Sequence, residues 1–227
     1  MKITFLGHAS LLIETAGKKL VVDPFISENF LSKDKIDPEQ IKADYILITH
    51  AHQDHVLDVE TIAEANPTAK IISNFEIVTY FSEFGIEGHP MNHGGSWNFD
   101  FGRLTMVNAW HSSSFADGTY GGNPAGFVLE SEGKSIYIAG DTGLTMDMKL
   151  IPLFTKLDLA ILPIGDNFTM GIESAVIASD YVECQRVLGY HYDTFGYIEI
   201  DHEKAKETFN KAGKELILLP VLGEIEV

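Results

Sequence analysis

The 227-residue chain contains little cysteine and no long apolar run. Cys184 is the only cysteine, which excludes a disulfide framework and predicts an inert thiol on a helix in a reducing, cytoplasmic setting. No apolar run approaches the roughly 20 residues that cross a bilayer. His8, Ser10 and Glu14 interrupt the apolar N-terminal stretch, so it does not fit a signal peptide. We therefore expect no membrane partner.

Basic residues are also scarce. Lys and Arg total 16 against 33 Asp and Glu, which gives a formal net charge of −17, and the only guanidinium groups belong to Arg103 and Arg186. Nucleic acid is not an expected partner, because contacts to a phosphate backbone depend on clustered Lys and Arg. We expect a soluble, cytoplasmic protein with a small-molecule partner, and the sequence leaves both a monomer and a homo-oligomer open.

The apolar residues follow the periods of an α/β protein, and a hydrophobic content of 45% is enough for a large core. The pattern predicts strands at 2–6, 10–15, 19–23, 45–49, 69–73, 96–100, 102–110, 124–130, 134–140, 157–165, 186–190 and 215–220. It predicts helices at 56–65, 75–84, 173–184 and 202–213. No linker or repeat divides the chain, so we expect one domain over 1–227, with two packed sheets covered by helices on both outer faces.

A dense group of metal-capable side chains lies at 49–55, THAHQDH, directly after a buried strand. Alternation along the strand places His50 and His52 on one side, where two imidazoles suit one ion. Asp54 and His55 point elsewhere from a tightening turn. A tetrahedral ion takes four ligands, so further ligands must come from other parts of the chain.

Three later residues each lie where a predicted strand ends: His111, Asp141 and His191. Together with the first four they supply five imidazoles and two carboxylates. That set is too large for one ion and suits two ions that share a bridging group.

The remaining histidines have simpler interpretations. His202 falls in the first turn of a predicted helix and is expected in solvent, whereas His89 and His93 flank a turn and are expected in a loop. His8 lies in the turn LGHAS and is either an ordinary turn residue or a residue of the substrate pocket. The hydroxyls of 112–114 are not surrounded by a nucleophile elbow, so we expect them to fill a polar loop beside the site.

These residues also carry a family resemblance. The run HAHQDH, an isolated His, an Asp in GDTG and a final His after a strand resemble the metallo-β-lactamase superfamily. The stretches ITFLGHASLLIE, WHSSS, PIGDNFTMG and HYDTF resemble its branch of metal-dependent hydrolases related to the L-ascorbate phosphate lactonases. The resemblance spans essentially the whole chain and implies a four-layer αββα sandwich, the metallo-β-lactamase fold.

The resemblance implies two divalent ions, with Zn favoured and Mn as the alternative. One ion would be bound by His50, His52 and His111 and the other by Asp54, His55 and His191, with Asp141 as the bridge. Ala51 stands where many members have Gly, and residues 165–167 read GDN where several relatives have GGH. Asn167 is thereby a candidate for the substrate pocket.

Such a centre implies hydrolysis by a metal-bound hydroxide, with Asp54 as the catalytic residue that orients the nucleophile and moves its proton. Asp23 is expected to accept a hydrogen bond from a ligand histidine or from the loop backbone. The expected substrate is a small ester, a lactone or a phosphodiester. Two alternatives are a nuclease of the same superfamily and a metal-binding sensor or scaffold without turnover.

Overall fold

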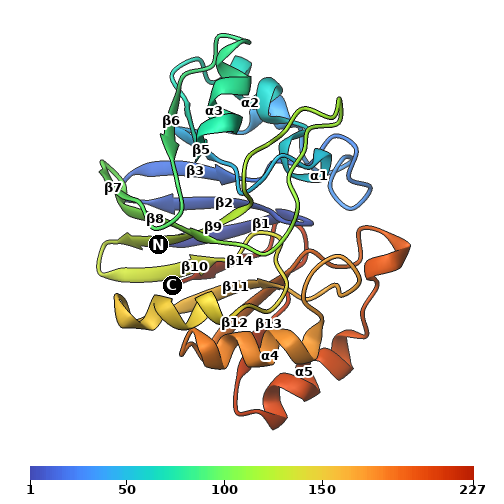
Figure 1. Cartoon of the computed structure of the whole chain (residues 1–227). Helices are drawn as coiled ribbons and strands as arrows, with labels where there is room; N and C mark the ends of the chain where they lie inside the picture. Colours follow the sequence, from blue (N-terminus) through green and yellow to red (C-terminus); the bar gives the residue numbers. More distant parts are fainter.

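The computed structural model describes residues 1–227 and contains two seven-stranded sheets packed face to face (Figure 1). The first sheet has the order β14 (Glu224–Glu226), β1 (Lys2–Gly7), β2 (Ser10–Thr15), β3 (Lys18–Val22), β4 (Tyr45–Leu47), β5 (Lys70–Asn74) and β6 (Gly88–Met91). The second has the order β13 (Glu215–Ile217), β12 (Arg186–Tyr190), β11 (Leu159–Pro163), β10 (Lys134–Ile138), β9 (Ala125–Ser131), β8 (Gly102–Asn108) and β7 (Ser96–Phe99).

Helices cover the outer face of each sheet, above and below the strands in Figure 1. The first sheet carries α1 (Gln53–Val56), α2 (Val59–Ala65) and α3 (Phe75–Ser82), and the second carries α4 (Ile172–Tyr181), α5 (His202–Lys211) and the 3-10 helix η2 (Met146–Leu153). Two further 3-10 turns are η1 (Pro38–Gln40) and η3 (Gly196–Ile198). The predicted αββα sandwich is confirmed.

The largest core cluster lies between the two sheets, where Ile3 and Leu20 of the first sheet pack with Phe127 and Ile161 of the second. Two further clusters lie between each sheet and its helices. Apolar residues are therefore buried on both faces of the central strands, as their continuous apolar runs predict.

Several predicted elements differ from the structure. The short strands β6 and β14 were not predicted, so His89, expected in a loop, lies on β6. The helix predicted at 56–65 is broken before α2, because Asp58 is buried and accepts hydrogen bonds from the backbone N–H groups of Ile26 and Ser27. Cys184 lies beyond the end of α4, where burial raises the pKa of its thiol.

Strand direction brings many loops to one edge. β3, β4, β5 and β6 run parallel, as do β10, β11, β12 and β13, and the antiparallel pairs give β1 the direction of β3 and β8 the direction of β10. The chain leaves β4 toward the right of Figure 1, where α1 lies. No helix of the chain has the length and apolarity needed to cross a membrane.

Candidate metal centre

Each predicted ligand lies beyond a strand's carboxyl end at this edge. His50, His52, Asp54 and His55 follow β4, whereas His111, Asp141 and His191 follow β8, β10 and β12. The structure brings all seven together in three overlapping groups, whose ligand atoms lie within 4.8 Å of one another inside each group.

The first group consists of His50, His52 and His111. His50 Nε2 lies 3.0 Å from His52 Nδ1, and the His111 ring centroid lies 5.1 Å from that of His50 and 5.0 Å from that of His52. Two nitrogens bound to one tetrahedral zinc at about 2.05 Å lie roughly 3.3 Å apart, so the observed spacing fits a shared ion.

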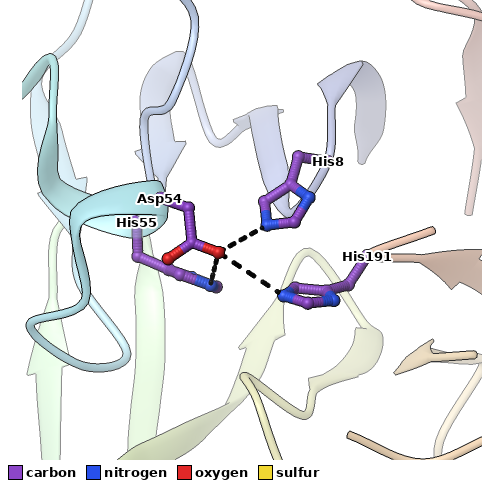
Figure 2. A group of neighbouring side chains, drawn as sticks. All are labelled: His8, Asp54, His55 and His191. Atoms are coloured by element: carbon purple, nitrogen blue, oxygen red, sulfur yellow. Dashed lines mark hydrogen bonds and ion pairs between the residues drawn. The ribbon is translucent and has the colours of Figure 1, made fainter. Parts of the chain in front are cut away.

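The second group consists of His8, Asp54, His55 and His191 and is drawn in Figure 2. Three imidazoles converge there on the same carboxylate oxygen. Asp54 Oδ2 lies 3.0 Å from His8 Nε2, 3.8 Å from His191 Nε2 and 3.9 Å from His55 Nε2. His8 is fully buried, and its contact with Asp54 places it beside the predicted ligands.

Asp141 lies between the two groups. Its Oδ2 is 2.9 Å from His191 Nε2 in the second group, and 3.6 Å from His111 Nε2 and 4.0 Å from His50 Nε2 in the first. Its Oδ1 is 3.4 Å from His55 Nε2. The carboxylate thus lies between ring nitrogens of both groups.

Several of these atoms are buried without a hydrogen-bond partner: His55 Nε2, His191 Nε2 and Asp141 Oδ1. A buried polar atom left unpaired costs roughly 1–3 kcal/mol. A divalent cation at the centre would satisfy all three at once, and imidazole nitrogen and carboxylate oxygen are donors that zinc and manganese accept. The residues present therefore fit the metal that the sequence resemblance implies.

Asp23 is buried and forms hydrogen bonds that orient the histidines of the centre. Its Oδ2 accepts hydrogen bonds from His55 Nδ1 at 2.9 Å and from the Thr49 hydroxyl at 2.7 Å, and its Oδ1 accepts from the Thr49 N–H at 2.8 Å. Because the Thr49 hydroxyl donates to Asp23, its oxygen is left to accept from His50 Nδ1 at 3.0 Å. These bonds keep the proton on Nδ1 of both rings and direct the Nε2 lone pairs toward the centre.

His8 holds Asp54 from the opposite side. Burial, reinforced by the neighbouring His191, lowers the pKa of His8 to about 3, so its ring carries a single proton at neutral pH. Asp54 is ionised and has no proton to give, so His8 Nε2–H donates to Asp54 and His8 Nδ1 accepts from the Thr194 hydroxyl at 2.9 Å.

The charges of the centre favour cation binding. Burial lowers the pKa of His50, His52 and His111, which leaves their nitrogen lone pairs free at neutral pH. Burial alone would raise the pKa of Asp141, but the neighbouring His191 and His55 lower it and keep the carboxylate ionised. Burial alone would lower the pKa of His55, but Asp141 and Asp23 raise it well above its ordinary value, so a cation that binds at His55 Nε2 would displace a proton from it.

The loop of the HAH run is fixed by small residues. Ser113 Oγ accepts from the Ala51 N–H at 3.1 Å and donates to the Gly121 carbonyl at 2.9 Å. A Cβ atom on Gly121 would lie 2.3 Å from Ala51 Cβ, so only glycine fits opposite this alanine. The serine run expected to fill a polar loop thus ties two ligand-bearing loops together.

Other predicted residues lie outside the cluster. Asn167 is exposed in the turn after β11 and makes no hydrogen bond to any of the seven predicted ligands. His93 contacts the Pro124 carbonyl, and His202, expected in solvent, pairs with Asp193.

Sequence reasoning missed the hydroxyls of Thr49 and Thr194. Both are buried, and each bonds a histidine of the centre. Thr49 directly precedes His50, and Thr194 lies three positions after His191. A hydroxyl close in sequence to a ligand histidine could have indicated a hydrogen bond to that histidine. For Thr194 this would have named the wrong partner, because its hydroxyl bonds His8, which is 186 positions away.

Comparison with known proteins places the chain in a family. The family model of the β-lactamase superfamily domain matches residues 2–191. UPF0173 metal-dependent hydrolases of Christiangramia forsetii and Flavobacterium johnsoniae are 63% and 65% identical over 227 residues, which is 100% of this chain and of each relative. The structure of Igni18, a metallo hydrolase from Ignicoccus hospitalis, has a TM-score of 0.89 at 33% identity and covers 100% of this chain and 98% of its own.

The matches extend over the whole αββα sandwich, including every strand whose carboxyl end carries a candidate ligand. They agree with the chemistry of the residues gathered there, which suits a cation. The chain therefore belongs to the metallo-β-lactamase superfamily and, within it, to the UPF0173 metal-dependent hydrolases.

Proposed function

We propose that this metal-dependent hydrolase uses two divalent ions, Zn²⁺ or alternatively Mn²⁺, to hydrolyse a small ester, lactone or phosphodiester-type substrate. The observation that carries the proposal is the position of Asp141. Its oxygens lie 2.9–4.0 Å from ring nitrogens of both ligand groups, and it is buried and ionised. A single ion would leave one of the groups without a cation.

His50, His52 and His111 would hold the first ion and Asp54, His55 and His191 the second, with Asp141 shared. Two such ions, when bound, would lower the pKa of a shared water toward 7. They would also polarise the carbonyl or phosphoryl oxygen of the substrate, so that its carbon or phosphorus is attacked more readily.

Asp54 is the proposed catalytic residue. Burial alone would raise its pKa, but His55 and the hydrogen bond from His8 lower it, so the carboxylate is ionised and accepts a hydrogen bond from the attacking water. The water oxygen joins the acyl carbon or phosphorus, the bond to the leaving oxygen breaks, and the proton received at Asp54 passes to that oxygen. His8 keeps Asp54 turned toward the reacting atoms throughout.

Metal analysis tests the dinuclear centre. Protein purified with Zn²⁺ or Mn²⁺ should contain two ions per chain by plasma mass spectrometry, and His111→Ala and His191→Ala should each retain about one. His202→Ala, which removes an exposed histidine outside the centre, is the matched control and should retain two. A wild-type content of one ion or fewer with both metals would refute the dinuclear arrangement.

The reaction is tested with a panel of lactones, thioesters and phosphodiesters. Asp54→Ala should abolish turnover by the metal-loaded protein. Unchanged biological activity of that variant would instead favour a sensor or scaffold. We propose a small molecule rather than a nucleic acid as the substrate because the net charge is −17. Cleavage of RNA or DNA at rates comparable to the small-molecule panel would reverse that choice.

A further inference from the structure

The loops around the centre differ from the rest of the surface in both charge and aromatic content. We infer that the substrate is an uncharged ester or lactone with an apolar, preferably aromatic, acyl group, and that anionic esters and phosphodiesters are poor substrates. The inference rests on the proposed function, because it narrows the substrate class of the same site.

The first observation is the absence of basic residues. Six segments follow β3, β4, β8, β10, β11 and β12, and none contains Lys or Arg: 23–32, 48–58, 109–124, 139–148, 164–171 and 191–201. Lys149 directly follows the fourth segment, and its ammonium group lies over the Tyr181 ring at 4.3 Å from the centroid. They carry carboxylates instead, among them Asp117, Asp166 and Asp193. Protein sites for phosphate and carboxylate groups use Arg forks or Lys ammonium groups. An anionic substrate would find only the ions themselves as positive partners.

The lysines that follow the first segment do not change this balance. Lys33 and Lys35 line a hollow of about 430 Å³ together with Asp34 and Asp37, and none of the predicted ligands lines it. Their charges are matched within that hollow by the two aspartates.

The second observation is a set of exposed aromatic rings on the same segments, Trp110, Phe168 and Tyr197, which are 71%, 51% and 79% exposed. Large rings outside the core bury their surface when an apolar partner binds. Trp110 directly precedes His111, and its loop is fixed beside the bridging carboxylate. The backbone N–H of Trp110 donates to the Thr142 hydroxyl at 2.9 Å, and the backbone carbonyl of Trp110 accepts from the Gly143 N–H at 3.1 Å.

The loop of Phe168 is joined to the same strand end. The Met170 N–H donates to the Thr142 carbonyl at 3.0 Å, one residue after Asp141. The Phe168 ring centroid lies 6.2 Å from that of Tyr197, which belongs to the turn after His191. In that turn, Phe195 packs edge-on against His8 at 5.4 Å between centroids.

These rings come from three loops, two of which bond the segment directly after Asp141, while the third packs against His8. A neutral aromatic group bound to the ions by its carbonyl would cover part of this surface. A contact with one such ring is worth up to about tenfold in binding.

The inference is tested by matched substrates and ligands of the Zn²⁺- or Mn²⁺-loaded protein. The value of kcat/KM, corrected for spontaneous hydrolysis, should be at least tenfold higher for 4-nitrophenyl butyrate than for the monoanionic 4-nitrophenyl succinate and bis(4-nitrophenyl) phosphate. The value of kcat/KM should likewise be about tenfold higher for 4-nitrophenyl phenylacetate than for 4-nitrophenyl acetate. By calorimetry, phenylacetohydroxamate should bind about tenfold more tightly than acetohydroxamate. This difference in affinity measures the contribution of the exposed aromatic side chains even if no substrate is turned over.

The double variant Phe168→Ala/Tyr197→Ala should reduce the phenylacetyl-to-acetyl ratio to near one in both kinetics and binding. Phe84→Ala is the matched control, because Phe84 is also 52% exposed but lies beyond α3, outside the six segments, and should leave the ratio unchanged. Equal or better use of the succinate or the phosphodiester, or an unchanged ratio in the double variant, would overturn the inference. Hydroxamate preference without any turnover would instead contradict the proposed function alone.

Discussion

The two ligand groups of the centre differ in how far they are enclosed. In the first group His111 is 14% exposed and His52 is partly exposed beside the exposed Ser112, with only His50 fully buried. In the second group the side chains of His8 and His55 are fully buried and that of His191 is 2% exposed.

The supporting hydrogen bonds follow this division only in part, because His50 of the first group also has a buried partner, Thr49. His55 and His8 are each held by a buried partner, Asp23 and Thr194, whereas His52 meets only an exposed serine outside its group. The imidazoles of the second group are therefore the more enclosed ones, whereas its carboxylate, Asp54, is 26% exposed. Three substitutions test how separate the two groups are.

The largest effect is expected for Asp141→Asn, which removes the charge that both groups share. Losing one bridging charge at two ions removes several kcal/mol, so kcat/KM should fall by about 1,000-fold or more. Both ions should be lost in parallel by mass spectrometry. Asp147→Asn, an exposed aspartate near the same strand end, is the control and should keep both ions. Loss of the second-group ion alone would mean that Asp141 does not bridge.

A smaller effect is expected for Asp23→Asn, which weakens the support of His55 directly and of His50 through Thr49. Such supporting residues are worth roughly 10–100-fold in metal affinity, and the ion of the second group should lose more because Asp23 bonds its ligand His55 directly. Competition with a chromophoric chelator measures both affinities. Asp58→Asn, another buried carboxylate with backbone partners, should lower the melting temperature but leave the affinities unchanged. Equal losses for the two ions would contradict this expectation.

The smallest effect is expected for His8→Gln, which should keep both ions because the second group retains Asp54, His55 and His191. Loss of an ion would instead make His8 a ligand. Burial lowers the pKa of His8 to about 3 in the folded chain, from an ordinary value of 6.5. Below pH 6.5 the unfolded chain therefore binds a proton that the folded chain does not, and the free energy of unfolding falls as the pH falls.

That contribution is absent from the His8→Gln variant. When both proteins are freed of metal, lowering the pH from 7 to 5 should reduce the free energy of unfolding of the wild type by about 2 kcal/mol more than that of the variant. Urea unfolding at the two pH values measures it. Parallel stability profiles would show that His8 is not held neutral in the folded chain.

Much of the fold could be predicted from the sequence, because the apolar runs of the central strands are buried on both faces. The failures came where tertiary contacts decide local structure. β6 and β14 are four and three residues long, too short for their apolar residues to show a strand pattern. The helix predicted at 56–65 is broken because Asp58 bonds the backbone of a loop about thirty positions earlier in the chain.

The sequence by itself determined the kind of centre: the residues of the HAHQDH run, and the later His111, Asp141 and His191 at strand ends, are donors suited to a cation. Only the tertiary structure decided which atoms meet. Asp141 reaches both groups because two sheets pack with their strand ends at a common edge, and His8 meets Asp54 because β1 runs in the direction of β3. These contacts join residues far apart in the chain, and the spacing of a sequence does not encode such distances.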